Sequence, residues 1–119
     1  MLQPRVFVKS KNKVYDVAEL HFDIKIVAYE NGVDFNYPNV HFKKVEFMEN
    51  TGFKDKNGKY IYEDDIVKND VNTYTIKRSE GYKVFSMYNG NLYVLLDESI
   101  CKEIEVIGNI YENKELLEC

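Results

Sequence analysis

The sequence has no long apolar run. A membrane-spanning helix needs about 18–20 consecutive apolar residues, and none of the 119 residues lies in such a stretch. Residues 1–5 also lack the apolar core of a secretory signal peptide. These absences exclude membrane-spanning and secreted proteins. We expect a soluble, cytoplasmic protein that does not contact membranes.

Cysteine and arginine are scarce, with two residues of each. Cys101 and Cys119 are too few for a disulfide scaffold, and their spacing matches no zinc or redox motif. The net charge is −4, and residues 60–119 hold twelve acidic but only six basic residues. Because duplex nucleic acid is bound by clustered Lys and Arg, this balance argues against it. The acidic second half is instead a candidate surface for a basic partner.

The motifs of nucleophilic catalysis and phosphate binding are also missing. His21 and Asp23 alternate on a predicted strand, which is the minimum geometry for two metal ligands, but His41 is the only other histidine. The acidic run at residues 63–65 lacks the alternating oxygen ligands of a calcium loop. We therefore expect no enzyme activity, no metal and no cofactor.

Turn signals are what the sequence does contain. Asn-Gly occurs at residues 31–32, 57–58 and 89–90, and this dipeptide favours two-residue type I′ hairpin turns. At residues 31–32 such a turn places Ala28 opposite Phe35 and predicts one core face and one largely solvated face. The predicted core face contains Ile26, Ala28, Val33, Phe35 and Tyr37. The predicted solvated face contains Lys25, Tyr29, Asp34 and Asn36.

The hairpin at residues 89–90 has no polar face. A two-residue turn there places Tyr88 opposite Asn91 and gathers one apolar set, namely Phe85, Met87, Leu92, Val94 and Leu96. The other face carries Tyr82, Val84, Tyr93 and Leu95, which together with Tyr88 form a candidate contact surface. Two interpretations remain open: burial within the monomer, or contact with a partner or a second copy of the chain.

Further strand signals follow one another at close spacing. They cover Arg5–Lys9, Val14–Asp16, Leu20–Ile24, Val40–Lys44, Ile66–Lys68, Thr73–Lys77 and Glu103–Ile107. Helix signals are limited to residues 63–65 and to the tail, where Asn113 can cap a turn. The pattern predicts a mainly β, barrel-like single domain of short antiparallel hairpins over residues 1–119, with one or two short helical turns.

Three segments resemble the YopX family. Residues 52–68, GFKDKNGKYIYEDDIVK, resemble its central motif TGLKDKNGKEIYEGDIV. Residues 104–117 resemble its closing motif, and residues 5–17 are similar to its opening hairpin, less specifically. The resemblance implies a small β-rich fold and an origin in phages or prophages of low-GC Gram-positive bacteria, and hence the cytoplasm of a bacterial host cell.

Two positions depart from the family pattern. Asp64 stands where the central motif usually has Gly, and Lys114 stands where the tail often has Pro. The turn at residue 64 must then tolerate Asp, which can enter the left-handed backbone region at modest cost. The loss of Pro at residue 114 removes a fixed φ but keeps the Asn113 cap.

The resemblance does not supply a reaction. We interpret the hairpin of the central motif as structural, with Asp55, Asn57, Gly58, Tyr60, Tyr62 and Asp65 as its main residues. Our first hypothesis is a non-enzymatic phage or prophage accessory protein that works through contacts with itself or with a host or phage protein. One alternative is an inhibitor of a host nucleic-acid-processing or defence machine that uses its acidic surface. Another is small-ligand or single-stranded nucleic-acid binding on a Tyr-lined barrel face.

Overall fold

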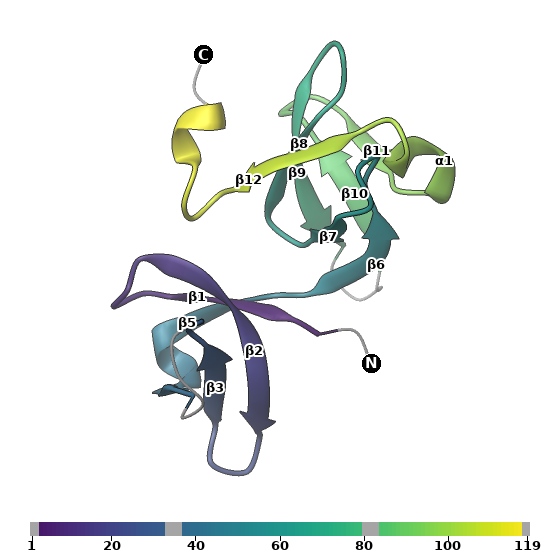
Figure 1. Cartoon of the computed structure of the whole chain (residues 1–119). Coiled ribbons are helices and arrows are strands. Elements are labelled where there is room, and N and C mark those ends of the chain that lie inside the picture. The colour runs from purple at the N-terminus through teal and green to yellow at the C-terminus, as the bar shows by residue number, and fades with distance from the viewer. Residues whose placement is uncertain (1–2, 33–36, 80–83, 118–119) are drawn as a thin grey trace. The chain divides into compact units, whose positions relative to one another are not determined.

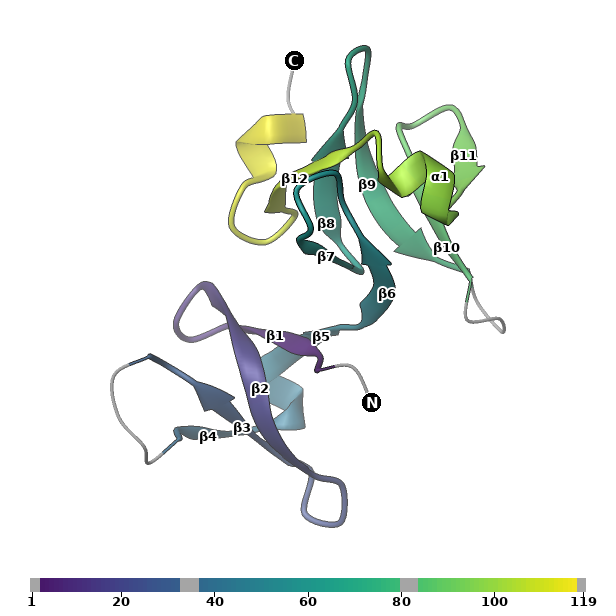
Figure 2. The same ribbon diagram turned by 45° about the vertical axis from the view of Figure 1, so that its right-hand side comes forward.

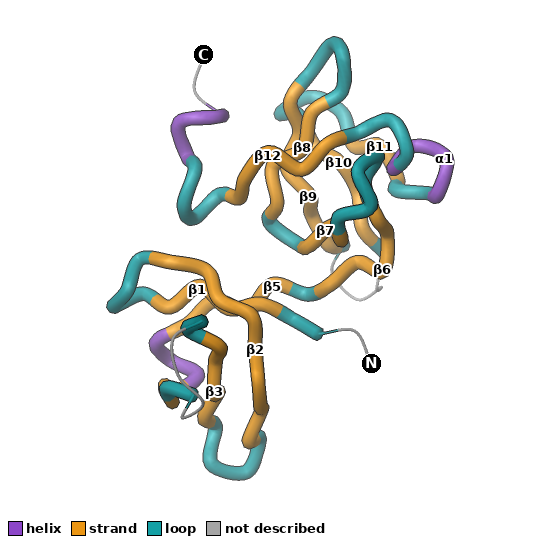
Figure 3. The backbone as a smooth tube through the Cα atoms, viewed as in Figure 1, coloured by secondary structure: helices purple, strands orange, loops and turns teal. Residues whose placement is uncertain are grey.

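The computed structural model of the chain describes residues 3–32, 37–79 and 84–117. Contacts divide the chain into two compact units, unit 1 (Met1–Glu49) and unit 2 (Asn50–Cys119). The domain expected over residues 1–119 therefore contains two units (Figures 1 and 3). Unit 1 has seven basic and seven acidic residues, whereas unit 2 has nine basic and thirteen acidic residues.

Unit 1 is a five-stranded antiparallel sheet with the strand order β4-β3-β2-β1-β5 (Figure 2). Its elements are β1 (Arg5–Val8), β2 (Lys13–His21), β3 (Ile26–Glu30), β4 (Asn39–His41), a 3₁₀ turn η1 (Phe42–Lys44) and β5 (Val45–Met48). The core lies on one face and consists of Val6, Val8, Val17, Val27, Tyr29 and Val45. Most of these residues are β-branched, which suits the pleated surface of a sheet.

The first hairpin differs from its prediction. The connection between β3 and β4 spans residues 31–38, and the Tyr29 N–H donates to the Pro38 carbonyl at 3.0 Å. Tyr29, predicted to be solvated, is buried in the core beside Val27. The main core lies on the Tyr29 side because the valines of β1, β2 and β5 are on that side. The predicted face was wrong in this respect, although its member Ala28 is also buried. Val33 and Phe35 fall outside the described residues.

The strand predicted at Leu20–Ile24 is also wrong beyond His21. Residues 22–25 form a turn, in which Lys25 adopts a φ of 55°. His21 does not face Asp23 along a strand; its Nε2 lies 3.0 Å from a carboxylate oxygen of Glu19. The predicted geometry for two metal ligands is therefore lost at the end of β2.

Unit 2 holds a two-stranded hairpin and a five-stranded antiparallel sheet with the order β11-β10-β9-β8-β12 (Figure 2). The hairpin consists of β6 (Asn50–Lys54) and β7 (Tyr60–Tyr62). The sheet consists of β8 (Asp65–Lys68), β9 (Thr73–Arg78), β10 (Phe85–Tyr88), β11 (Tyr93–Leu95) and β12 (Glu105–Asn109). Two short helical elements complete it, α1 (Glu98–Cys101) and η2 (Lys114–Leu117).

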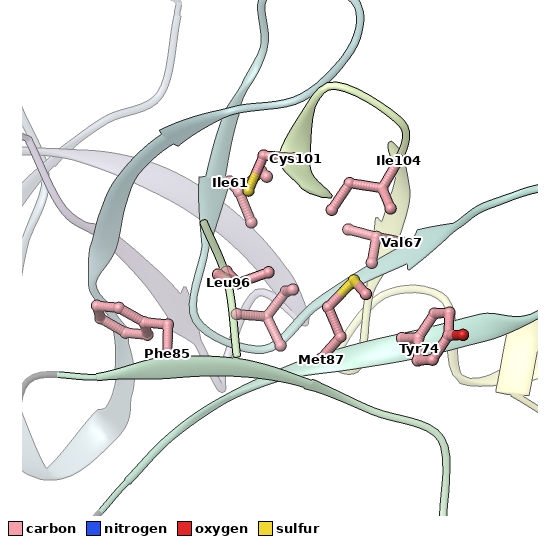
Figure 4. Packing of buried hydrophobic residues seen from close by; sticks show 9 residues of the cluster. Ile61, Val67, Tyr74, Phe85, Met87, Leu96, Cys101 and Ile104 are labelled. Carbon is pink, nitrogen blue, oxygen red and sulfur yellow. The ribbon is translucent and has the colours of Figure 1, made fainter. Parts of the chain in front are cut away.

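The main core of unit 2 lies on one face of its sheet, together with side chains of α1 and β7, while Ile66 and its partner Thr75 are buried on the other face. Figure 4 shows side chains from β8, β9, β10 and α1 pointing toward one another. The buried members are Ile61, Val67, Tyr74, Ile76, Phe85, Met87, Leu96, Cys101 and Ile104. Strand alternation therefore turns every second residue of β10 and β11 toward the opposite face.

The mainly β fold with short helical turns is confirmed, whereas a closed barrel is not. Each five-stranded sheet ends in two edge strands, β4 and β5 or β11 and β12, and a closed barrel has no edges. The tail turn η2 forms as predicted, with the Leu116 N–H donating to the Asn113 carbonyl, but the side-chain Oδ1 of Asn113, predicted to cap this turn, accepts the Asn109 N–H at 3.1 Å. Residues 63–64 form a non-helical turn instead. The α1 turn, capped by the Asp97 side chain, was not predicted.

Candidate functional site

The turn between β10 and β11 sets which side chains share a face. The Asn89 Oδ1 accepts the N–H groups of Asn91 and Leu92, both at 3.0 Å. Gly90 has a φ of 98°, but Asn89 has no positive φ, so the predicted type I′ turn centred on Asn89 and Gly90 does not form. Tyr88 consequently pairs with Tyr93 rather than with Asn91. The register differs from the prediction by two residues, and an even shift leaves the face of every paired side chain unchanged. Leu92, predicted on the core face, instead falls in the turn and is 56% exposed.

One face of this hairpin belongs to the core, and the other is exposed at Tyr93 and Leu95 of β11 but only half-buried at Ser86 and Tyr88 of β10. Phe85 and Met87 are buried, whereas Tyr93 is 63% and Leu95 59% exposed. The interpretation of burial within the monomer is therefore wrong for Tyr93 and Leu95. We call this second surface the outward face; its described members are Val84, Ser86, Tyr88, Tyr93 and Leu95. Tyr82 lies outside the described residues.

An aromatic pair and a shallow hollow mark the outward face. The Tyr88 and Tyr93 rings stack at a centroid distance of 4.4 Å, and the Tyr88 hydroxyl donates to the Gly90 carbonyl at 3.0 Å. Beside Tyr93 lies a hollow of about 360 Å³, lined by Lys77, Arg78, Ser79, Ser86 and Tyr93. Sequence reasoning missed the basic residues, because the connection between β9 and β10 gives no register signal like Asn-Gly.

The backbone of β11 is open along one side. In an antiparallel ladder, hydrogen-bonded pairs alternate with non-hydrogen-bonded pairs. The Leu96 N–H donates to the Phe85 carbonyl at 3.0 Å, so Val94 and Met87 form the next hydrogen-bonded pair. The N–H and C=O groups of Tyr93 and Leu95 therefore point away from β10, toward an edge at which the structure describes no further strand.

The opposite edge of the same sheet is covered. Asp55 is 5% exposed, and its Oδ2 accepts the N–H of Val106 in β12 at 2.9 Å. Its Oδ1 accepts the N–H groups of Asn57 and Lys59, both at 2.9 Å. The Lys56 N–H donates to the Ile104 carbonyl at 3.0 Å. One carboxylate therefore closes the β6–β7 turn and also joins it to the edge of β12.

The remaining residues of the central motif also make contacts within the fold. Gly58 has a φ of 79°, with its N–H donating to the Asp55 carbonyl. Tyr62 is buried and donates its N–H to the buried Asp65 carboxylate at 2.8 Å. The Tyr60 ring is 37% exposed and has the Lys54 Nζ 5.0 Å from its centroid. All of these contacts lie within the fold, and the structural role of the motif stays a prediction.

The Asp at the family's glycine position adopts the expected backbone. Asp64 has a φ of 69°, and its carbonyl accepts the Ile110 N–H at 3.0 Å. Its side chain also accepts a hydrogen bond from the Tyr111 hydroxyl at 2.9 Å, a contact that the sequence did not indicate.

Gly108 in β12 is closely packed against the tail. A Cβ at this position would lie 2.5 Å from the Asn113 Oδ1.

A second hollow of about 480 Å³ lies between the β6–β7 hairpin and α1. Its lining residues are Gly52, Phe53, Lys54, Asp55, Tyr60, Glu98, Cys101 and Lys102. Burial raises the pKa of the Cys101 thiol to about 11, and the nearby Asp97 adds to the shift. The thiol is therefore protonated at neutral pH and a poor nucleophile. Among the described residues, no group of three or more His, Cys, Asp or Glu could hold a metal ion.

The fold and the exposed surface define the class of protein: a two-unit antiparallel β protein whose second sheet has one covered and one open edge. The model of the YopX protein family matches residues 4–118, and the chain belongs to the YopX family. No helix in the described ranges is long and apolar enough to cross a membrane.

A solved structure has a similar fold. The crystal structure of protein EF1440 from Enterococcus faecalis superposes with a TM-score of 0.68 at 24% sequence identity. The match covers 98% of this chain and 97% of that chain. At this identity the likeness concerns the fold alone. No curated protein matches the sequence.

Proposed function

We propose that this YopX-family protein is a non-enzymatic accessory protein that acts through protein–protein contacts at the outward face of β10 and β11. One observation carries the proposal: Tyr93 and Leu95 are both more than half exposed on a strand whose backbone groups are open to a partner. Aromatic residues are enriched in the cores of protein interfaces. An exposed sheet edge is also the surface to which a partner strand adds.

Photo-cross-linking tests this surface directly. A photoreactive phenylalanine analogue at position 93 of the full chain, expressed in bacterial cells, should form discrete protein adducts. The same analogue at position 71 is the matched control, because Val71 is 82% exposed in the turn between β8 and β9. Adducts specific to position 93 support the proposal. Identical adduct patterns at both positions, or none at position 93, overturn it.

The hollow beside Tyr93 favours a second candidate, single-stranded nucleic acid. Base stacking on an aromatic ring combined with nearby cations is the usual mode of such binding, and Lys77 and Arg78 line the hollow with Tyr93. Fluorescence anisotropy with a labelled oligothymidylate provides the measurement. Tyr93→Ser should weaken binding, and Lys77→Gln should reduce its salt dependence. Lack of binding by the unmodified chain at low salt would remove this candidate.

The acidic-surface hypothesis stays a prediction. Unit 2 carries the excess of acidic residues, and binding through it should weaken steeply as salt screens the charges. The phage or prophage origin and the cytoplasmic location in a bacterial host also stay predictions.

A further inference from the structure

We infer that the occupant of the open edge is a second copy of this chain, with β11 pairing antiparallel to β11 about a two-fold axis at Val94. The inference rests on the proposed function, since it names the partner of the same surface. It follows from the backbone register, from the order of side chains along β11 and from the chemistry of the other sheet edges.

The backbone register suits self-pairing. An axis at Val94 places Tyr93 of one copy opposite Leu95 of the other. These are the residues whose N–H and C=O groups face the open edge. Each Tyr93–Leu95 pair then exchanges two hydrogen bonds, and the two-fold axis doubles them. The Val94 residues of the two copies form the non-hydrogen-bonded pair between them. Val94 therefore keeps its backbone hydrogen bonds to β10, while Tyr93 and Leu95 bond to the second copy.

The side chains are complementary in the same register. On the outward face, Tyr88 stacks on Tyr93 within one copy. Across the new contact, Tyr93 meets Leu95 of the second copy, which in turn neighbours that copy's Ser86. Aromatic–aliphatic pairs of this kind stabilise neighbouring strands. Because β11 contains no charged residue, the paired strands themselves bring no like charges together.

The other three edges of the two five-stranded sheets differ from β11. β4 carries Asn39 and His41, and β5 carries Glu46, which lies 3.5 Å from the Lys9 Nζ. β12 carries Glu105 and has a register shift next to the Asp55 contact. Charges, irregular pairing and covering segments are the usual protections of an edge strand. Of these four edge strands, β11 alone consists of apolar and aromatic residues, Tyr93-Val94-Leu95.

The contact is small, so the dimer should be weak. Stable complexes bury about 1,200–2,000 Å² in total, and a three-residue strand with two large exposed side chains offers less. We expect a dissociation constant on the order of 100 µM. Sedimentation velocity of the full chain from about 5 µM to about 1 mM should show a shift from monomer to dimer. A monomer at every concentration overturns the inference.

Charge exchange tests the register. In the Tyr93→Lys/Leu95→Lys variant, the Lys at position 93 of each copy lies opposite the Lys at position 95 of the other, so the dimer contains two pairs of facing ammonium groups. The Tyr93→Glu/Leu95→Glu variant contains two pairs of facing carboxylates in the same way. Each variant alone should remain monomeric at about 1 mM, whereas an equimolar mixture should form a heterodimer. Val71→Lys and Val71→Glu are the matched controls, and they should dimerise like the unmodified chain. A mixture that stays monomeric while the unmodified chain dimerises overturns this register.

A backbone variant tests strand pairing separately. Proline at position 95 removes an N–H that β10 does not use but the second copy requires. Leu95→Pro should therefore keep the circular-dichroism spectrum of the fold and lose the dimer. A folded Leu95→Pro variant that dimerises normally overturns strand pairing. Cross-links at position 93 to other proteins only, with a monomeric chain, overturn the second copy as partner but support the proposed function.

Discussion

The two edge strands of the unit 2 sheet, β12 and β11, differ in what their outward-facing backbone groups contact. At β12, the buried Asp55 carboxylate and the Lys56 N–H occupy outward-facing backbone groups of residues 104 and 106. At β11, Tyr93 and Leu95 present backbone groups and large side chains to solvent. The central family motif therefore serves the closed edge, while the surface available for contact lies at the other end of the sheet. The motif and the proposed interaction surface therefore lie at opposite edges of this sheet.

Removing the Asp55 carboxylate should break the covered edge. Asp55→Ala leaves the N–H groups of Asn57, Lys59 and Val106 without their acceptor. Because hydrogen bonds to charged groups contribute about 1.5–3 kcal/mol each, we expect a loss of about 3 kcal/mol or more in urea unfolding. Asp55→Asn keeps one acceptor oxygen and should lose less. A loss below about 1 kcal/mol for Asp55→Ala would contradict the bridging role.

A side chain at Gly108, near the C-terminal end of β12, should have the next largest effect on the free energy of unfolding. The new Cβ in Gly108→Ala meets the Asn113 side chain at 2.5 Å, and such overpacking costs about 1–3 kcal/mol. Asn113→Gly in the same chain removes the clashing atoms, so thermal unfolding should show a double variant more stable than additivity predicts. Gly58→Ala is the control, since its Cβ meets nothing within 4 Å and its cost comes from positive φ alone. Strict additivity at residues 108 and 113 would argue against the clash.

Asp64 and Tyr111 should behave as a coupled pair. Asp64→Gly removes the steric cost of a side chain at a φ of 69°, but it also removes the hydrogen bond from the Tyr111 hydroxyl. The left-handed backbone costs about 1–2 kcal/mol, whereas a hydrogen bond to a carboxylate contributes about 1.5–3 kcal/mol, so the single change should destabilise the protein by about 0.5–1 kcal/mol. In a Tyr111→Phe background the same change should stabilise the protein by about 0.5–1 kcal/mol. Equal effects of Asp64→Gly in both backgrounds would show that the hydroxyl contact contributes nothing.

The smallest effect is expected at the open edge. At low concentration, Leu95→Ser should change the free energy of unfolding by less than about 0.5 kcal/mol, because the side chain is 59% exposed. The neighbouring Val94 packs against the core of unit 2, so Val94→Ser should cost about 1–2 kcal/mol. Similar losses for both variants would mean that the outward face contributes to folding rather than being free for contact.

Local sequence signals predicted several parts of the fold. Strand alternation placed Tyr93 and Leu95 together on one face of their hairpin, and the two-residue register error left that face unchanged because it was even, although it moved Leu92 from the strand into the turn. The left-handed backbone at Asp64 also followed from the motif alone. In each case the deciding interaction lies within a few residues along the chain.

Other parts depended on contacts between distant residues. The core face of β3 is decided by the valines of β1, β2 and β5, so the alternation of its own hairpin pointed to the wrong side. The partner of the Asp55 carboxylate in β12 and the partner of Asp64 at Tyr111 are 51 and 47 residues away. No local spacing indicates which N–H or hydroxyl will reach a given carboxylate. The candidate surface was accordingly predicted better than the contacts that hold the sheet beside it.

The Asp55 bridge also bears on the order of folding. Its contact with Val106 closes a loop of 51 residues, and the entropy lost on closure rises with loop length. The β6–β7 turn, which uses the other oxygen of the same carboxylate, closes over four residues. We therefore expect the turn to form early, with one carboxylate oxygen still solvated, and β12 to dock late. When β12 docks, its Val106 N–H thus donates to an Asp55 carboxylate oxygen that the β6–β7 hairpin has already positioned.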